Sequence, residues 1–179
     1  GGGEIGVSWG GYHPNRKAWV YLEFANDGPR GGGPNLDGAD GLAAPILNMA
    51  NTPIESIESE QPLLVERYGF VPDTGGAGKD RGGLGIEREF RLLAEEATVH
   101  LRSDRSDFTP WGVMGGKPGT PTENYLNPGT DREEKLPGKT LRQLKKGDLY
   151  RVVRPARAAT ETPWNGRCTP WPTTWSKRS

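Results

Sequence analysis

Hydrophobic and polar residues alternate along several short stretches of this sequence, a pattern typical of β-strands that bury one face. The clearest stretch covers residues 17–24, where aromatic and branched side chains dominate. Residues 84–93 place leucine, isoleucine, arginine and phenylalanine on one face, and residues 97–102 continue with the opposite phase. Residues 63–70 form a further stretch. The sequence therefore predicts a mainly β, antiparallel fold with one or two short helices.

The order of these stretches between residues 63 and 153 is typical of a β meander. Its last two strands, residues 140–144 and 149–153, flank the turn at residues 145–148 and predict a β-hairpin. Residues 72–83 form a long connection rich in glycine. We interpret that connection as a structural turn between strands.

A single short helix is predicted just before residue 62. Thr52 and Glu55 have the spacing of a capping box, in which each side chain bonds to the backbone of the other. Pro53 would occupy the first helical position, where its missing N–H costs nothing. Pro62 then ends the helix.

The last part of the chain differs in kind from the rest. Residues 154–179 contain no Leu, Ile, Val, Phe or Met, yet they hold three of the six tryptophans, four prolines and the single cysteine. Such a segment cannot bury a regular apolar face, so we expect it to be disordered. The sequence thus divides into a folded part, residues 1–153, and a tail, residues 154–179.

Composition narrows the class of protein. Gly (27) and Pro (16) occur at about twice their usual share, which excludes a long helical bundle. Lys plus Arg equals Asp plus Glu, at 23 each, so we expect no nucleic-acid partner. No apolar run is long enough to span a bilayer, and no signal segment opens the chain. We therefore expect a cytoplasmic protein with no membrane partner, and Cys168 alone excludes an internal disulfide.

Metal and nucleotide sites are not indicated by the obvious candidates. His13 and His100 are the only histidines, and neither has a partner at ligand spacing, so no metal site is predicted. Gly78 and Lys79 resemble part of a phosphate-binding loop. The glycine five residues earlier and the hydroxyl residue afterwards are both missing, so the pattern fails.

Arginine and aspartate gather where the strand at residues 97–102 ends. Arg102, Asp104 and Arg105 could orient a carboxylate or phosphate of a partner, or they could form an internal ion-paired turn. Trp111 follows shortly afterwards and could stack on a ligand or pack on the sheet. These residues give no reaction by themselves.

Several ordered stretches together resemble the C-terminal third of the hydantoinase B family. That family includes the B-type subunits of N-methylhydantoinase, the second half of ATP-dependent 5-oxoprolinase and the large subunits of acetone and acetophenone carboxylases. Residues 72–85 carry the most specific likeness. The stretches are residues 9–12, 30–41, 51–55, 72–85, 103–105, 111–119, 136–139 and 146–148.

The resemblance implies a fragment of a hydantoinase B-like subunit. With a hydantoinase A-like, ATP-using partner subunit, such a subunit hydrolyses cyclic amides of the hydantoin or 5-oxoproline type. The alternatives are a fragment of an acetone- or acetophenone-type carboxylase, which acts on a ketone, and a truncated remnant that is inactive alone. The resemblance places ATP and a divalent metal on absent or partner segments, so we expect the fragment itself to bind no cofactor.

Two departures from the family qualify the resemblance. Family members are several times longer, and their metal-binding part is absent from this sequence. After Val153 the family continues with a glycine-rich motif, whereas this chain continues with Arg154 and Pro155. A shift of reading frame after Val153 would account for the unusual tail, because a displaced frame permits the family motif.

Specific roles follow for only a few residues. We expect Arg102, Asp104 and Arg105 to form a binding or interface cluster, and Asn48 and Asn51 to anchor a polar loop. No catalytic residue is assigned. A third possibility, a small β-rich ligand-binding module, rests on tryptophans that could face a ligand: Trp9, Trp19 and Trp111.

Overall fold

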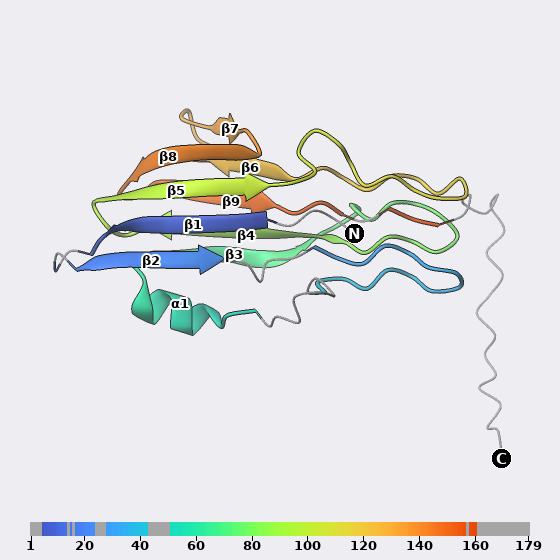
Figure 1. The fold of residues 1–179 in the computed structure, drawn as a ribbon, viewed down its shortest axis with the longest axis horizontal. Coiled ribbons are helices and arrows are strands. Elements are labelled where there is room, and N and C mark those ends of the chain that lie inside the picture. Colours follow the sequence, from blue (N-terminus) through green and yellow to red (C-terminus); the bar gives the residue numbers. More distant parts are fainter. Residues whose placement is uncertain are drawn as a thin grey trace, which may run out of the picture.

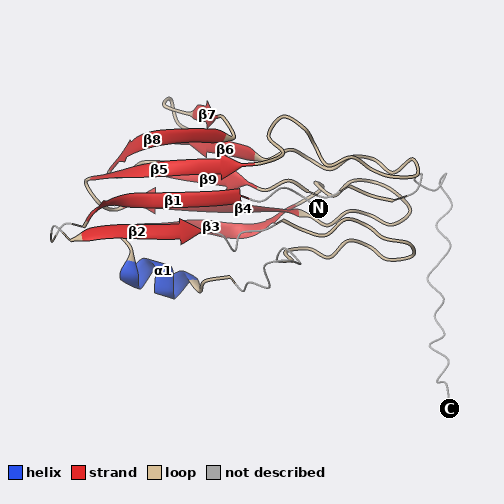
Figure 2. Ribbon diagram, viewed as in Figure 1, coloured by secondary structure: helices blue, strands red, loops and turns tan. Residues whose placement is uncertain are grey.

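The computed structural model describes residues 5–13, 15, 17–23, 28–42, 51–156 and 158–160. In this part of the chain, β-strands dominate and one short helix accompanies them (Figure 2). The elements are β1 (Ile5–Tyr12), β2 (Ala18–Glu23), α1 (Ile54–Glu60), β3 (Leu63–Val71), β4 (Gly85–Leu92), β5 (Glu96–Ser103), β6 (Glu123–Leu126), β7 (Glu134–Leu136), β8 (Lys139–Lys145) and β9 (Leu149–Val153).

The strands form two sheets that lie face to face (Figure 1). One sheet has the order β2-β1-β5-β8 and the other the order β3-β4-β9-β6-β7. The strand pairs with assigned register are all antiparallel, which confirms the predicted fold class. A sandwich of this kind buries the inner face of each sheet against the other.

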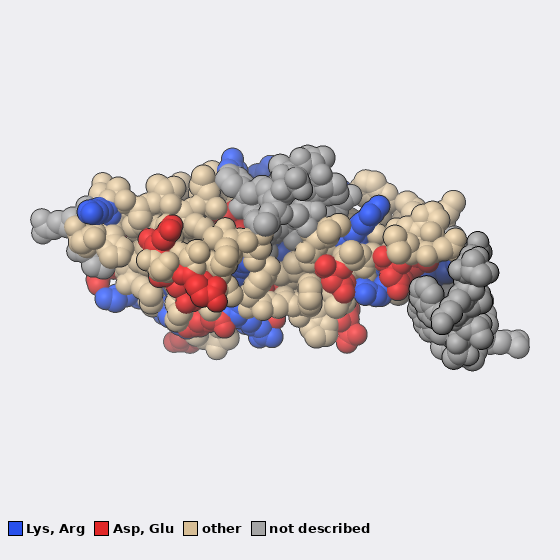
Figure 3. All heavy atoms as spheres, turned by 90° about the horizontal axis from the view of Figure 1, so that it is seen from below, with Lys and Arg blue, Asp and Glu red and all other residues tan. Residues whose placement is uncertain are grey.

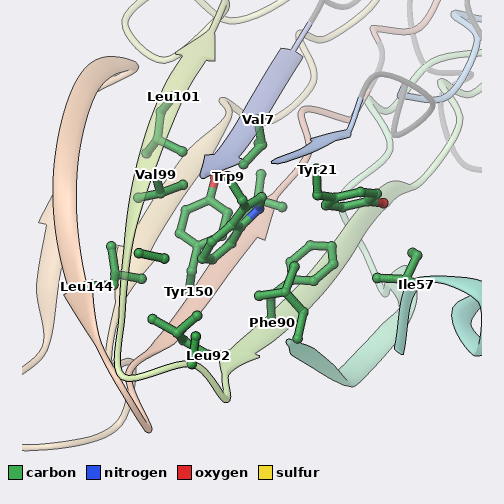
Figure 4. Packing of buried hydrophobic residues seen from close by; sticks show 14 of the residues in the cluster. Val7, Trp9, Tyr21, Ile57, Phe90, Leu92, Val99, Leu101, Leu144 and Tyr150 are labelled. Atoms are coloured by element: carbon green, nitrogen blue, oxygen red, sulfur yellow. The ribbon is translucent and has the colours of Figure 1, made fainter. Parts of the chain in front are cut away.

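The core lies between the sheets and is built around Trp9 (Figure 4). Trp9 on β1 stands opposite Tyr21 on β2 and Val99 on β5. Its ring meets two rings of the other sheet, with centroid distances of 5.9 Å to Phe90 and 5.7 Å to Tyr150. Tilted and edge-on contacts of this kind add to the stabilisation that burial of the aromatic surface provides.

Strand β4 is central and buried on both faces, although its sequence alternates between apolar and charged residues. The inner face carries Phe90 and Arg88, which have no exposed surface. The outer face carries Glu87 and Glu89, each covered by a neighbouring arginine side chain. Ion pairs with arginines on the adjacent strands thus make a charged outer face compatible with burial.

The predicted β-hairpin at residues 145–148 is wrong. Strand β8 belongs to one sheet and β9 to the other, so the turn carries the chain across the sandwich. The turn is closed by the Asp148 N–H, which donates to the Lys145 carbonyl at 2.9 Å, and Gly147 has a φ of 86°. Both flanking strands alternate, and alternation alone does not tell a hairpin from a crossing between two sheets. The meander interpretation fails for the same reason, since β4 and β5 also lie in different sheets.

The helix is confirmed, but its predicted cap is not. Helix α1 begins at Ile54 and has Pro53 as its N-cap residue, without a side-chain cap. The Pro53 carbonyl instead accepts the N–H groups of Ser56 and Ile57 at 3.1 and 3.2 Å. Ile57 is the buried residue of the helix and belongs to the core cluster, so packing holds the helix in place.

Glycine-rich loops project from one end of the sandwich and lie side by side (Figure 1). Backbone hydrogen bonds join them, such as the Gly83 N–H to the Arg30 carbonyl at 2.9 Å. A Cβ atom on Gly83 would lie 2.4 Å from the Ala39 carbonyl oxygen, so the close approach requires glycine. We call these segments the loop layer: residues 28–42, 72–84, 104–122, 154–156 and 158–160.

The packed chain continues past Val153, where the sequence predicts a disordered tail. Arg154 and Ala156 are buried, and Thr160 forms β-bridges with Asp80 and Val113. The backbone of Ala158 and Ala159 lies against Gly31, Gly76 and Gly116 of the loop layer, which explains how a segment without large aliphatic residues packs. Residues 161–179 lie outside the described residues, and the proposed frame shift stays a prediction.

Candidate functional site

A hollow lies between three segments of the loop layer. Its volume is about 240 Å³. Arginine and tryptophan form one wall, and glycine and alanine backbone forms the other. We call it the Arg105 hollow, and it is lined by Gly31, Gly32, Arg105, Pro110, Trp111, Val113, Ala158, Ala159 and Thr160.

The backbone around Arg105 fixes the position of its side chain. Arg105 follows the end of β5 and has a φ of 63°, a conformation that residues other than glycine rarely adopt. Buried Thr122 holds it there, because its N–H donates to the Arg105 carbonyl at 3.0 Å and its hydroxyl donates to the Asp104 carbonyl at 2.7 Å. The half-buried Arg105 side chain then lies over Trp111, with its guanidinium carbon 5.2 Å from the ring centroid.

Trp111 is held at the surface and does not pack into the sheets. It is 69% exposed, whereas Trp9 and Trp19 are 1% and 7% exposed and lie in the core. Of the tryptophans proposed to face a ligand, Trp111 is therefore the one the structure leaves accessible. An aromatic face beside a guanidinium can take a flat or apolar ligand surface.

The backbone wall of the hollow is closely packed, because Gly32 lines it and Gly116 packs against the lining residue Ala159. A Cβ atom on Gly32 would lie 2.4 Å from the Asp80 carbonyl oxygen, and one on Gly116 would lie 2.3 Å from the Ala159 carbonyl oxygen. The Gly32 N–H donates to the Ala158 carbonyl at 3.2 Å. The shape of this surface thus depends on the absence of side chains at these positions.

The predicted cluster of Arg102, Asp104 and Arg105 is divided by the structure. Asp104 and Arg105 line a second hollow of about 460 Å³ between residues 103–108 and 137–139. Arg102 is exposed on β5, opposite Lys139 of β8, and lines neither hollow. Among the described residues no ion pair joins Asp104 to either arginine.

Of the two asparagines expected to anchor a loop, Asn48 lies outside the described residues. Asn51 holds a different place, at the exposed end of a polar network that reaches into the sandwich. Its side-chain carbonyl accepts from Arg88 at 2.7 Å, and its amide donates to the Tyr68 hydroxyl at 3.0 Å. Asn51 therefore joins the segment that precedes α1 to both β3 and β4.

The centre of that network is a buried ion pair between Arg88 on β4 and Glu23 at the end of β2. The two side chains are 0% and 1% exposed, and their nearest nitrogen and oxygen are 2.5 Å apart. The Tyr21 hydroxyl donates to the same Glu23 oxygen at 2.5 Å. Burial, reinforced by the Glu23 charge, raises the pKa of Tyr21 far above its usual range. The Tyr68 ring covers the guanidinium at 4.0 Å.

Sequence reasoning does not single out Arg88 or Glu23, although a signal for them exists. Arg88 occupies the apolar phase of β4, between Ile86 and Phe90. Glu23 continues the face that carries Trp19 and Tyr21. Opposite charges at inward positions of two different strands indicate a buried pair, since a single buried charge is strongly unfavourable.

The remaining chemistry candidates stay apart in the structure. His100 is exposed on β5, and His13 lies in the connection between β1 and β2. Lys79 donates to the Asn35 side chain at 3.3 Å as part of the loop layer. The described part of the chain contains no group of three or more His, Cys, Asp or Glu side chains that could hold a metal. The Arg105 hollow offers a cation, an aromatic face and closely packed backbone, and these groups can bind a ligand.

Two surface properties bear on possible partners. On the face drawn in Figure 3, acidic and basic side chains are interspersed and do not form one basic patch. In the described part of the chain, no helix is long and apolar enough to cross a membrane.

Comparison with known proteins places these features in a family context. The family model described as hydantoinase B/oxoprolinase matches residues 3–156. A Pseudomonas protein named as the B component of a D-/L-hydantoinase is 33% identical over 146 residues, which cover 79% of this chain and 24% of that protein. The chain spans about a fifth to a quarter of the length of the first curated relatives that it matches.

Two solved structures share the fold. The nucleotide-free structure of acetone carboxylase superposes with a TM-score of 0.76 at 18% identity, over 91% of this chain and 26% of that chain. The ATP-dependent caprolactamase from Pseudomonas jessenii superposes with a TM-score of 0.74 at 22% identity, over 88% of this chain and 29% of that chain. At these identities the likeness concerns the fold alone.

Proposed function

This chain belongs to the hydantoinase B/oxoprolinase family, and we propose that it is a fragment of a hydantoinase B-like subunit that takes part in the hydrolysis of cyclic amides. The observation that carries the proposal is the family match over residues 3–156, which runs through both sheets and reaches residues 154–156 of the loop layer. The hydantoinase relative supports the choice of a cyclic amide as substrate.

In the proposed reaction an ATP-using partner subunit activates the amide. An amide carbon is a poor electrophile. ATP would supply a phosphoryl group to the amide oxygen and leave as ADP, which makes the carbon easier to attack, and phosphate would be released once water has added and the ring C–N bond has broken. Each 1.4 kcal/mol removed from the barrier raises the rate about tenfold. The name of the caprolactamase, a fold neighbour that is ATP-dependent, supports this coupling.

The role of this fragment is to supply a β scaffold and a binding surface beside the reacting centre or the subunit interface. The described residues do not fit a divalent metal, because three ligand side chains do not gather among them. We therefore assign the metal and ATP to other segments or to the partner subunit.

A carboxylase is the second candidate function. It is favoured by the fold shared with acetone carboxylase. In that case the loop layer would bind a ketone substrate, and the reaction would form a bond between a carbon of the ketone and the carbon of bicarbonate.

A graft into the full-length hydantoinase relative tests the proposal. Residues 3–156 of this chain replace the matching segment of that relative, and the graft is purified with its partner subunit. Consumption of hydantoin and of acetone with bicarbonate is then measured with and without ATP. The unmodified relative and a version that lacks the segment serve as controls.

The proposal predicts ATP-dependent opening of hydantoin by the graft and no such activity in the deleted version. ATP-dependent use of acetone and bicarbonate would favour the carboxylase instead. A graft that is folded and bound to its partner but opens no ring would refute the proposal and favour an inactive remnant.

A further inference from the structure

We propose that the Arg105 hollow binds a small organic acid. Arg105 forms an ion pair with the carboxylate of the acid, and the Trp111 ring contacts the rest of the molecule. The choice of acid rests on the proposed function. When water opens a cyclic amide, the ring C–N bond breaks, a C–O bond to the water oxygen forms, and the nitrogen takes a proton. The resulting carboxylic acid loses its proton, so the open-chain product carries a carboxylate that the ring lacks.

Arg105 has the free donors that such a site needs. Among the described residues its side chain makes no ion pair, and its aromatic contact is the stack on Trp111. Stacking uses the face of the guanidinium and leaves the N–H groups at its edge available. Those edge donors match the two oxygens of a carboxylate.

Arg105 is preorganised: its position is fixed before a ligand binds. Thr122 is buried and donates to the carbonyls of both Asp104 and Arg105, so it holds the peptides on both sides of Arg105 and keeps Arg105 in its unusual φ. An unfavourable conformation that the surroundings enforce is a frequent feature of ligand sites. The fixed backbone and the contact of the guanidinium with Trp111 together place the Arg105 donors before an anion binds, which lowers the entropic cost of binding.

The charges around the hollow favour an anion over a cation. Among the described residues that line it, Arg105 alone carries a charge. Asp80 lies behind Thr160, is nearly fully buried, and accepts from the Asn35 N–H at 3.1 Å and the Thr160 hydroxyl at 3.3 Å. Asp104 and Asp107 line the neighbouring hollow, which Arg105 also borders, and among the described residues neither forms an ion pair with Arg105.

Size and shape favour a small ligand. The volume of about 240 Å³ lies just below the roughly 300–1,000 Å³ of pockets for drug-sized molecules. The exposed Trp111 ring offers an apolar face for the body of the acid. The uncharged cyclic amide could lie on the same ring but would form no ion pair with Arg105. The hollow therefore distinguishes the open acid from the closed ring.

Binding of three related molecules to the full chain tests the inference without ATP or a partner. N-carbamoylglycine carries the carboxylate, N-carbamoylglycinamide replaces it with an amide, and hydantoin is the corresponding ring. Dissociation constants are measured by calorimetry, and the indole N–H signal of Trp111 is followed by NMR after its assignment with Trp111→Phe. We expect N-carbamoylglycine to bind at least about tenfold more tightly than either uncharged molecule.

Variants then locate the site. Arg105→Gln should lose at least about tenfold in affinity for N-carbamoylglycine and leave the weak binding of the amide unchanged. Arg105→Lys keeps the charge and should retain part of the affinity, which separates the charge from the paired geometry. Lys145→Gln removes the same charge from an exposed position on β8 and should change nothing. Thermal unfolding of each variant shows that the fold is intact.

Equal binding of N-carbamoylglycine and its amide, or unchanged affinity in Arg105→Gln, would overturn the inference and leave the proposed function standing. Acetate binding as tight as that of N-carbamoylglycine would overturn the role given to Trp111. A graft that opens no ring, in a chain that still binds the carboxylate selectively, would refute the proposed function and leave this inference standing.

Discussion

Removal of Arg88 should destabilise the protein more than removal of any exposed charge. Arg88→Met keeps much of the side-chain volume but leaves Glu23 charged, buried and without its cationic partner. Breaking a buried ion pair from one side costs about 3–5 kcal/mol, since the remaining charge is not solvated. The Asn51 side chain also loses a donor, but it is exposed and can bond to water instead.

The double variant Glu23→Leu/Arg88→Met tests whether the cost of removing Arg88 comes from the unpaired Glu23 carboxylate. Replacing both charges with apolar groups removes the stranded carboxylate, and such exchanges are often close to neutral. The Tyr21 hydroxyl then loses its acceptor inside the core, which costs about 1–3 kcal/mol. The double variant should therefore be more stable than Arg88→Met alone by about 2 kcal/mol, as the difference between these two costs.

Urea unfolding followed by far-ultraviolet circular dichroism measures these differences. Arg142→Met is the matched control, because its ion pair with Glu134 is exposed on both sides and should contribute less than about 1 kcal/mol. A cost below about 1 kcal/mol for Arg88→Met, or a double variant as unstable as the sum of its two single variants, would refute the reasoning.

Two further predictions concern the loop layer and the response to acid. Gly83→Ala should lower the free energy of unfolding by at least about 2 kcal/mol, because its Cβ would meet backbone at 2.4 Å, whereas Gly69→Ala has open space and should change it by less than about 1 kcal/mol. Equal effects in thermal unfolding would show that the loops do not pack this closely. The hydrogen bond from Arg81 holds the pKa of Asp40 below its usual range, and the bond from Arg91 does the same for Glu66. Since these pKa values are lowered by folding, the stability they provide is present above about pH 4.5 and is lost as the pH falls through the lower folded values. Asp40→Asn should reduce this loss as the pH falls below about 4.5, while Asp131→Asn, which removes an exposed carboxylate, should leave it unchanged.

The strands whose side chains alternate can be predicted from the sequence, because alternation reports directly which side chains face the core. Strands β2, β3, β4 and β5 lie within one or two residues of their predicted positions. Strand β1 escapes prediction, since four of its eight positions are glycine or serine and its inward residues Val7 and Trp9 are few. The sheet to which each strand belongs depends on distant contacts that no local pattern encodes.

The candidate site is predictable only in part. A cation and an aromatic residue at the end of β5 are visible in the sequence, and Arg105 and Trp111 do meet in one hollow. The opposite wall, from Gly31 to Thr160, comes from segments far away in the chain. Arg102 and Arg105 are close in sequence, which is why they are grouped. Strand β5 ends between them, so Arg102 belongs to the sheet and Arg105 to the loop layer.

The central claim is that this chain forms a working part of an enzyme that opens cyclic amides at the expense of ATP. The most direct measurement is the rate at which the purified graft, with its partner subunit, converts hydantoin to its open acid in the presence and absence of ATP. We predict ATP-dependent conversion within about tenfold of the unmodified relative, which corresponds to a barrier change below about 1.4 kcal/mol. A folded, assembled graft that produces no acid with ATP would contradict the account.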